Sequence, residues 1–292
     1  MKSHTYDLEL ITPCFCAGAD QAVAEIRPAS IRGQLRWWFR ALGGSAANES
    51  FIFGSAAGES GSASRVRIAV SHEQIGEAQP MAQFSPNDAV SYIWHYARVS
   101  GAGGRGAVGP RWQTSGVLPV GTKFRLHLTQ LRDLGNLQKA FDEALLAFLT
   151  FGSLGLRATR GLGAFHCTQA TDLSKAVDCM EKGSFTVRKR TSPDSFADYQ
   201  SAMNDWASWL RYRFRSQYKH DRPSPLGGIK PRQASALHFR PIRIADKSFT
   251  WYAFEAPGNR VLGMTSRRGA PILSAYNLSG PKPEPPLRPR RY

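Results

Sequence analysis

The sequence predicts an α+β protein in which helices pack against antiparallel sheets. Short segments that alternate apolar and polar residues indicate strands, and two longer segments with apolar residues every three or four positions indicate amphipathic helices. Across the first 170 residues these segments follow the order strand, helix, strand, strand, helix, strand. With 292 residues, of which 42% are hydrophobic, the chain is long enough for two modest domains with real cores.

The first half of the pattern begins with a strand at residues 6–11. Residues 28–42 are predicted to be a helix, because Pro28 suits a first helical turn and Gly43 and Gly44 follow the last one. At 100° per residue, one apolar stripe of this helix comprises Ile31, Leu35, Trp38, Phe39 and Leu42.

The second half of the pattern contains strands at 65–70, 123–131 and 164–168 and a helix ending near 151. Between 71 and 122 we expect only a strand around 92–99 and a mobile loop at 101–109. The resulting βαββαβ order is that of a ferredoxin-like fold, which also carries the RNA-recognition motif, although the aromatic strand signature of that motif is absent.

We expect tandem ferredoxin-like domains. The first spans residues 1–175, and the second, complete or partial, spans 182–279. The second should contain a strand at 185–188, a long helix at 195–219 and a hairpin formed by 237–244 and 249–254. The proline-rich tail, 280–292, should be extended or disordered.

The chain is strongly basic, with 38 Lys and Arg against 22 Asp and Glu and a formal net charge of +16. Such a surplus favours a phosphate polymer as partner. No apolar stretch is long enough for a membrane span and the N-terminus does not resemble a signal peptide, so we expect a cytoplasmic protein. The four cysteines form no CxxC pair, which favours free thiols over a metal site.

Two elements rich in glycine and arginine are the candidate RNA-binding sites. The first, residues 27–44, carries Arg32, Arg36 and Arg40 in a row beside the apolar stripe. No Asp or Glu lies four positions away within that helix, so these arginines are predicted to contact phosphate or a charged partner subunit. Trp37 points away from the stripe and could stack on a base or enter a subunit interface.

The second element is a glycine loop, residues 155–163. Arginines match phosphate geometry, and glycines let a ligand approach the backbone closely. The predicted RNA contacts of this loop are Gly155, Arg157, Arg160, Gly161 and Gly163. In a later loop, Lys230 and Arg232 could bind phosphate or be ordinary exposed charges. The P-loop pattern GxxxxGK[ST] does not occur.

Three segments carry a family resemblance: IRPASIRGQLRWWFRALGG with the IFGS that follows it, GLRATRGLGAF, and KPRQASALHFRPI. Together they resemble the RAMP superfamily of CRISPR–Cas systems, and the first is similar to the signature of the subunit-one family of type III-B (Cmr) effector complexes. The resemblance implies an RNA-binding subunit that lies near the 3′ end of the guide RNA and helps to capture target RNA. It implies other RAMP subunits as partners, no cofactor and no catalytic residue, because target cleavage belongs to another subunit.

Two alternatives stay open at this point. Some RAMP proteins process precursor CRISPR RNA with a catalytic histidine, and Asp20 is an outside candidate for metal-assisted cleavage. The histidines to consider are His4, His72, His95, His127, His166, His220 and His238. The other alternative is a purely structural assembly subunit whose arginines meet acidic proteins.

Overall fold

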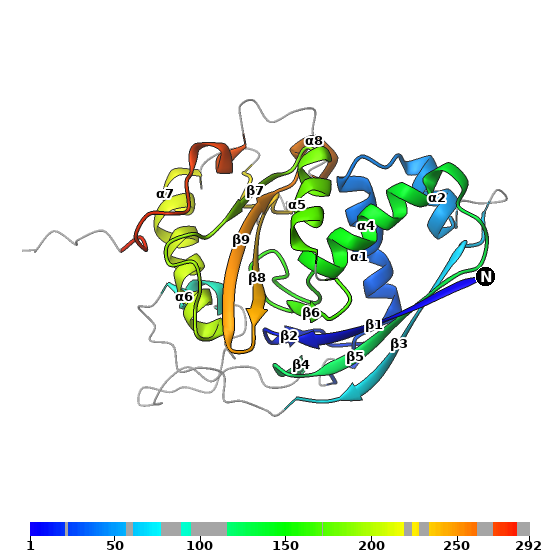
Figure 1. Ribbon diagram of the computed structural model, residues 1–292, viewed down its shortest axis with the longest axis horizontal. Helices are drawn as coiled ribbons and strands as arrows, with labels where there is room; N and C mark the ends of the chain where they lie inside the picture. The colour runs from blue at the N-terminus through cyan, green and yellow to red at the C-terminus, as the bar shows by residue number, and fades with distance from the viewer. Residues whose placement is uncertain are drawn as a thin grey trace, which may run out of the picture.

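The computed structural model describes residues 1–20, 23–56, 61–76, 89–94, 116–170, 172–218, 224–227, 234–261 and 271–284. Its larger sheet has four strands, ordered β3-β5-β1-β6, and all neighbours are antiparallel (Figure 1). The strands are β1 (Lys2–Leu10), β3 (Val66–Gln74), β5 (Lys123–Gln130) and β6 (Phe165–Cys167). The predicted α+β class with antiparallel sheets is confirmed, and the predicted βαββαβ order is present in this half of the chain.

One face of this sheet is covered by α1 (Pro28–Ala41) and α4 (Gln138–Phe151). The predicted stripe of α1 explains this packing, because four of its five members are buried and Leu42 is partly buried. Pro28 occupies the first turn, as predicted. On the sheet, alternate residues such as Leu8 and its cross-strand partner Phe124 enter the same core.

The smaller sheet has three strands in the order β7-β9-β8. These are β7 (Thr186–Lys189), β8 (Leu237–Ala245) and β9 (Ser248–Glu255), so the predicted hairpin is confirmed. The predicted long helix is also present, as α6 (Tyr199–Ser208), a π-helical segment (Trp209–Phe214) and α7 (Arg215–Tyr218). A second complete ferredoxin-like domain stays a prediction.

The two sheets share one hydrophobic core. Trp38 of α1 stacks on Phe185 at a centroid distance of 5.7 Å and contacts Phe254 of β9 at 5.5 Å. Helix α5 (Leu173–Lys182) packs between α4 and β7 and adds Met180 to this core. The domain boundary between 175 and 182 stays a prediction, and the side chains on either side of it are packed together.

Several elements were not predicted, among them short 3₁₀ turns at Gly135–Leu137 and Ile272–Ala275. The others are α2 (Ala46–Phe53), α3 (Val90–Trp94), α5 (Leu173–Lys182), α8 (Gly258–Val261), β2 (Cys14–Phe15) and β4 (Val117–Leu118). The strand expected at 92–99 is wrong in its first three residues, which belong to α3. Residues 95–99, the expected loop at 101–109 and residues 285–292 of the tail lie outside the described residues.

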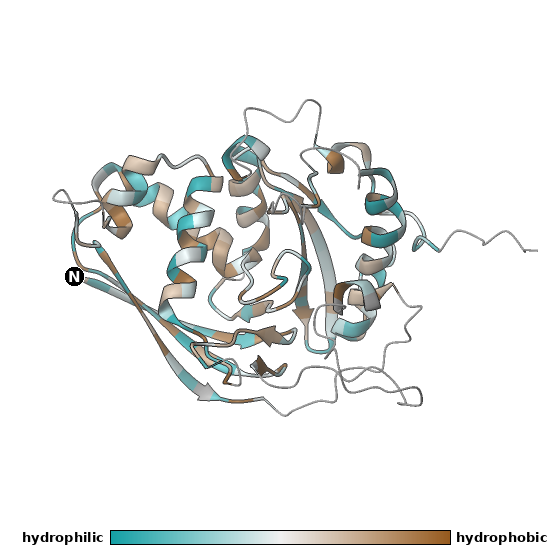
Figure 2. Ribbon diagram, turned by 180° about the vertical axis from the view of Figure 1, so that it is seen from behind, coloured by the Kyte–Doolittle hydropathy of each residue, from teal (hydrophilic) through white to brown (hydrophobic). Residues whose placement is uncertain are grey.

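Hydrophilic residues recur along the helices (Figure 2). In the described part of the chain, no helix combines the length and the apolar character that a membrane crossing requires. All four cysteines are free thiols, and two of them, Cys14 and Cys167, are buried.

Candidate nucleic-acid interface

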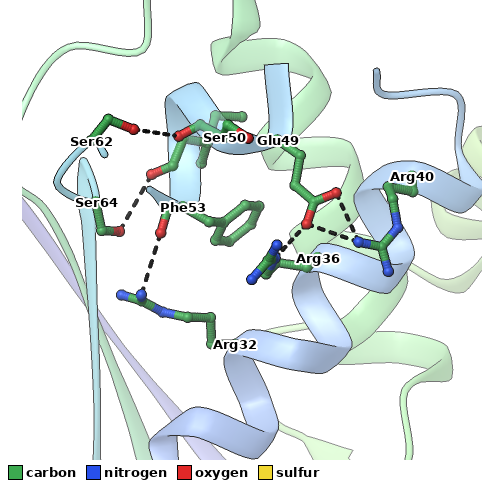
Figure 3. Close-up of polar contacts among 9 residues, drawn as sticks. Arg32, Arg36, Arg40, Glu49, Ser50, Phe53, Ser62 and Ser64 are labelled. Atoms are coloured by element: carbon green, nitrogen blue, oxygen red, sulfur yellow. Dashed lines mark hydrogen bonds and ion pairs between the residues drawn. The ribbon is translucent and has the colours of Figure 1, made fainter. Parts of the chain in front are cut away.

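Helices α1 and α2 are joined by one carboxylate that binds two arginines. Glu49 of α2 is only 3% exposed, and it accepts hydrogen bonds from Arg36 Nε and Arg40 Nη1. Arg40 Nη1 lies 2.8 Å from each carboxylate oxygen (Figure 3). Charge-assisted bonds of this kind hold both guanidinium groups in defined positions.

The acid that pairs with these arginines comes from an element that the sequence pattern did not reveal. Within α1 there is no acidic residue one turn away, as expected, and the neighbouring helix supplies Glu49 instead. The side chains of Arg36 and Arg40 are still 41% and 43% exposed. Two positive charges face one negative charge, so this surface keeps a net positive charge and N–H donors for an anion.

Arg32, the third arginine of the row, is bonded to backbone carbonyls. Its guanidinium donates to the oxygens of Phe53 at 3.3 Å and Val66 at 3.4 Å. Phe53 is the last residue of α2, where helix carbonyls carry partial negative charge. Arg32 therefore ties the end of α2 to the start of β3, and a contact between Arg32 and phosphate stays a prediction.

The IFGS segment folds around a glycine that the structure requires. Gly54 has φ +80°, and a Cβ at this position would lie 2.6 Å from the carbonyl oxygen of Ser62. Ser64 Oγ lies 3.4 Å from the carbonyl oxygen of Ile52. The two parts of the N-terminal signature are joined by the bond from Arg32 to the carbonyl oxygen of Phe53.

Trp37 lies between the two halves of the molecule and is partly buried. Its ring contacts Trp38 edge-on at 5.0 Å and His238 of β8 at 5.1 Å. Trp38 is buried in the core, as predicted. Base stacking or subunit contact by Trp37 stays a prediction, and its present contacts are with its own chain.

The glycine loop packs tightly against the protein itself. Its three glycines all have positive φ: +75° at Gly155, +83° at Gly161 and +65° at Gly163. A Cβ would lie 2.3 Å from the Phe15 oxygen at the first, 2.7 Å from the Trp206 ring at the second and 1.8 Å from the Leu154 oxygen at the third. The backbone and side chains that approach these glycines closely are the protein's own, and their contact with RNA stays a prediction.

The two arginines of this loop have different surroundings. Arg160 is 5% exposed, and it donates to the carbonyl oxygens of Leu226 and Leu237 at 2.6 and 3.2 Å. Its burial lowers its pKa to about 10. Arg157, by contrast, is exposed with φ +59°, and its neighbour Leu156 is 61% exposed. Arg160 was predicted to neutralise phosphate, but its side chain is buried. Arg157 lies at the surface, where an anion can reach it.

The remaining candidates fall into three groups. Lys230, Arg232, His95 and His220 lie outside the described residues. His4 and His72 are on exposed strand positions and Asp20 is in an exposed bend. His127 bonds Thr5 at 3.1 Å and Ser71 at 2.9 Å, and burial lowers the pKa of both His166 and His238. Within the ranges that the structure describes, no three His, Cys, Asp or Glu side chains are grouped as metal ligands.

The two Gly/Arg elements are not brought together. The arginines of α1 lie beside α2, and the glycine loop packs on β2, α6 and β8. Figure 1 places α2 and α6 toward opposite ends of the long axis. The sequence signal that could have revealed α2 is Ser45, whose hydroxyl accepts from the Asn48 N–H at 3.1 Å and caps the helix.

The comparisons assign the fold and this signature to a known class. The family description of the RAMP superfamily matches residues 7–166, just over half of the chain, and the chain belongs to that superfamily. Among curated proteins, it is 30% identical over 156 residues to CRISPR system Cmr subunit Cmr1-1 of Pyrococcus furiosus, a match covering 50% of this chain and 42% of that protein. It is also 52% identical over 44 residues to subunit Cmr1-2 of the same organism, covering 15% of this chain and 24% of that one. These matches therefore span less than half of the length of either relative.

Two solved structures share the fold. The crystal structure of Cmr1 from Pyrococcus furiosus in its apo form superposes with a TM-score of 0.56 at 20% identity, covering 95% of this chain and 92% of that one. The fold also occurs in the cryo-EM structure of the type III-B Cmr-beta bound to cognate target RNA and AMPPnP, in the presence of ssDNA. One chain of that complex gives a TM-score of 0.53 at 13% identity and covers 86% of this chain and 93% of its own length.

Proposed function

We propose that this protein is a non-catalytic RNA-binding subunit of a type III-B (Cmr) RNA-guided interference complex. In this role it binds near the 3′ end of the guide RNA and helps to capture target RNA, beside other RAMP subunits. Membership of the RAMP superfamily and the similarity to Cmr subunits support the assignment. The observation that carries the RNA-binding part is the Arg36–Glu49–Arg40 unit, because it offers two positioned, partly exposed guanidinium groups with a net positive charge.

Recognition of this kind reads the phosphate backbone more than the bases. Guanidinium groups neutralise phosphates and release counterions, so affinity falls steeply with salt and depends little on sequence. The net charge of +16 provides the field that attracts the RNA.

The first test measures binding of the purified chain to labelled single-stranded RNA over a series of salt concentrations, with sampling for cleavage with and without divalent metal. The double variant Arg36→Ala/Arg40→Ala should bind all RNA sequences more weakly and flatten the salt slope by about 1.4 units, about 0.7 for each phosphate contact with a single strand. The matched control is Lys139→Ala/Lys182→Ala, which removes two exposed charges from α4 and α5. It should retain most of the affinity.

The alternatives give different results. RNA cleavage that is lost in His4, Asp20 or His166 variants would favour the processing nuclease. An affinity that is absent at low salt would favour the assembly subunit. If wild type binds RNA but the arginine pair and the lysine control weaken it equally, α1 is not the contact site.

A further inference from the structure

The long helix of the second half ends in a basic segment with unusual geometry. Its residues 209–214 form a π-helix, which is rare and occurs frequently at functional sites. Residues 209–218 include Arg211, Arg213 and Arg215 and no acidic residue. The one acid of α6, Asp205, is buried and bonded to Arg190, so it does not offset these charges at the surface.

Arg215 lies over an aromatic ring. Its guanidinium carbon lies 4.4 Å from the centroid of the Tyr92 ring, and the side chain is exposed. Tyr92 belongs to α3 and is partly buried against a second hydrophobic cluster, which contains Trp206, Phe214 and Phe239. An exposed guanidinium in a cation–π contact is a planar group on which another flat group can stack.

The same place adjoins the glycine loop. The pKa of Arg160 is lowered first by burial, and the charges of Arg157 and Arg215 lower it further, while Tyr92 raises it. The packing agrees: Arg160 N donates to the carbonyl oxygen of Arg157 at 2.7 Å, and Leu162 of the loop lies in the same hydrophobic cluster as Tyr92 and Phe214. The exposed members of this group, Arg157 and Arg215, come from segments far apart in the sequence.

We propose that Tyr92, Arg215 and Arg157 form a second contact for single-stranded RNA, in which one base stacks on the Arg215 guanidinium and Arg157 holds a neighbouring phosphate. Bases of single-stranded nucleic acids stack on aromatic rings and on arginine planes, and such stacking tolerates any base. The inference rests on the proposed function and adds a base contact at the end of the molecule opposite α2.

The test compares the affinity of wild type and variants for a single-stranded RNA and for an abasic oligomer of the same length and charge. Arg215→Lys keeps the charge and loses the plane, so it should weaken RNA binding about fivefold or more and leave the abasic affinity and the salt slope unchanged. Arg213→Lys is the matched control. Arg213 is also exposed on the long helix, but its charge lowers the pKa of Tyr276 and not that of Arg160. It should bind like wild type.

A second pair of variants tests the ring. Tyr92→Phe keeps the aromatic face and should bind RNA like wild type, whereas Tyr92→Leu should reproduce the loss seen in Arg215→Lys. Thermal melting of each variant identifies any loss of folding, and the Phe and Lys variants are conservative enough to keep the fold.

The outcomes separate this inference from the proposed function. If Arg215→Lys and Arg213→Lys both bind RNA like wild type, or if Arg215→Lys affects the abasic oligomer equally, the stacking site is overturned and RNA binding through α1 stands. If Arg215→Lys loses co-purification with a protein subunit but binds RNA normally, the surface docks a protein and the inference is likewise overturned. If wild type binds no RNA, both fail.

Discussion

Arg160 Nη1 lies 3.2 Å from the carbonyl oxygen of Leu237, so the glycine loop is bonded directly to the first residue of β8. A second arginine makes the reverse link, from β8 to α4 and the larger sheet. Arg240 of β8 is buried and donates to the carbonyl oxygens of Thr150 in α4 and Phe165 in β6. Part of the large arginine content therefore stabilises the interior and is not available to a phosphate polymer.

Replacing Arg160 should cost stability more than it changes RNA contacts. Arg160→Ala removes the guanidinium donor from the carbonyl oxygen of Leu226 and leaves that of Leu237 with the Ser235 hydroxyl alone, and we expect a loss of about 2–4 kcal/mol in the free energy of unfolding. Urea denaturation measures it. Arg157→Ala is the control, and as an exposed change it should stay within about 0.5 kcal/mol. Equal stability of the two variants would contradict the structural role of Arg160.

Gly163 should tolerate no side chain. In Gly163→Ala the new Cβ meets the Leu154 oxygen at a backbone with φ +65°, so we expect a loss of about 3 kcal/mol or more. Gly135→Ala separates the two causes, because Gly135 also has positive φ (+57°) but open space around it. That control should lose only about 1 kcal/mol. The comparison is made by thermal or urea unfolding, and similar losses in both would mean that the close approach at Gly163 relaxes.

Neutralising Glu49 should loosen the link between α1 and α2. Glu49→Gln removes the charge that binds Arg36 and Arg40, and because both arginines are partly exposed we expect a loss of only about 1–2 kcal/mol. Glu181→Gln, an exposed change on α5, should cost nothing measurable. Chemical denaturation at low and moderate salt measures both. A Glu49→Gln variant as stable as wild type would show that the ion pairs contribute no net stability.

His238 should make stability depend on pH. Burial lowers the pKa of His238 to about 3, while the unfolded residue titrates near its ordinary value of about 6.5. Between these two values the unfolded chain binds a proton that the folded chain does not, so stability is full above about pH 6.5 and falls as the pH decreases toward 3. His238→Phe keeps a ring between Trp37 and Phe254 and removes this proton. Wild type should lose about 1–2 kcal/mol more than the variant between pH 7.5 and pH 5, as followed by urea unfolding. Parallel pH profiles would contradict a neutral, partly buried His238.

The sequence pattern predicts the fold well where periodicity is long. The stripe of α1, the strand alternation of β1 and β5 and the β8–β9 hairpin are all read correctly because each element buries one regular face. Helices α2 and α5 and strands β2 and β4 were missed: α2 has eight residues, α5 has ten and the strands have two each. Elements this short carry too few residues for a period to appear.

The sequence identifies the arginines and glycines of the candidate site but not the groups that they contact. Arginine beside glycine indicates phosphate binding, but the same chemistry satisfies backbone carbonyls inside a protein, as Arg32 and Arg160 do. Sequence separation hides this, because the acceptors of Arg160 lie 66 and 77 positions away. The glycines are equally ambiguous, since close approach is required whether the neighbour is RNA or Trp206.

The aromatic core that joins the two sheets has a consequence for protein engineering. Trp38 packs on Phe185 and Phe254, and Arg260 of α8 donates to the carbonyl oxygen of Ala41, the last residue of α1. A chimera that grafts the C-terminal half of a relative onto residues 1–175 would have to carry over these junction residues together with the strands that hold them. Homologous proteins with this fold should therefore be exchanged as the whole two-sheet body. A chimera joined at residue 175 alone would leave Trp38 and the end of α1 without their partners.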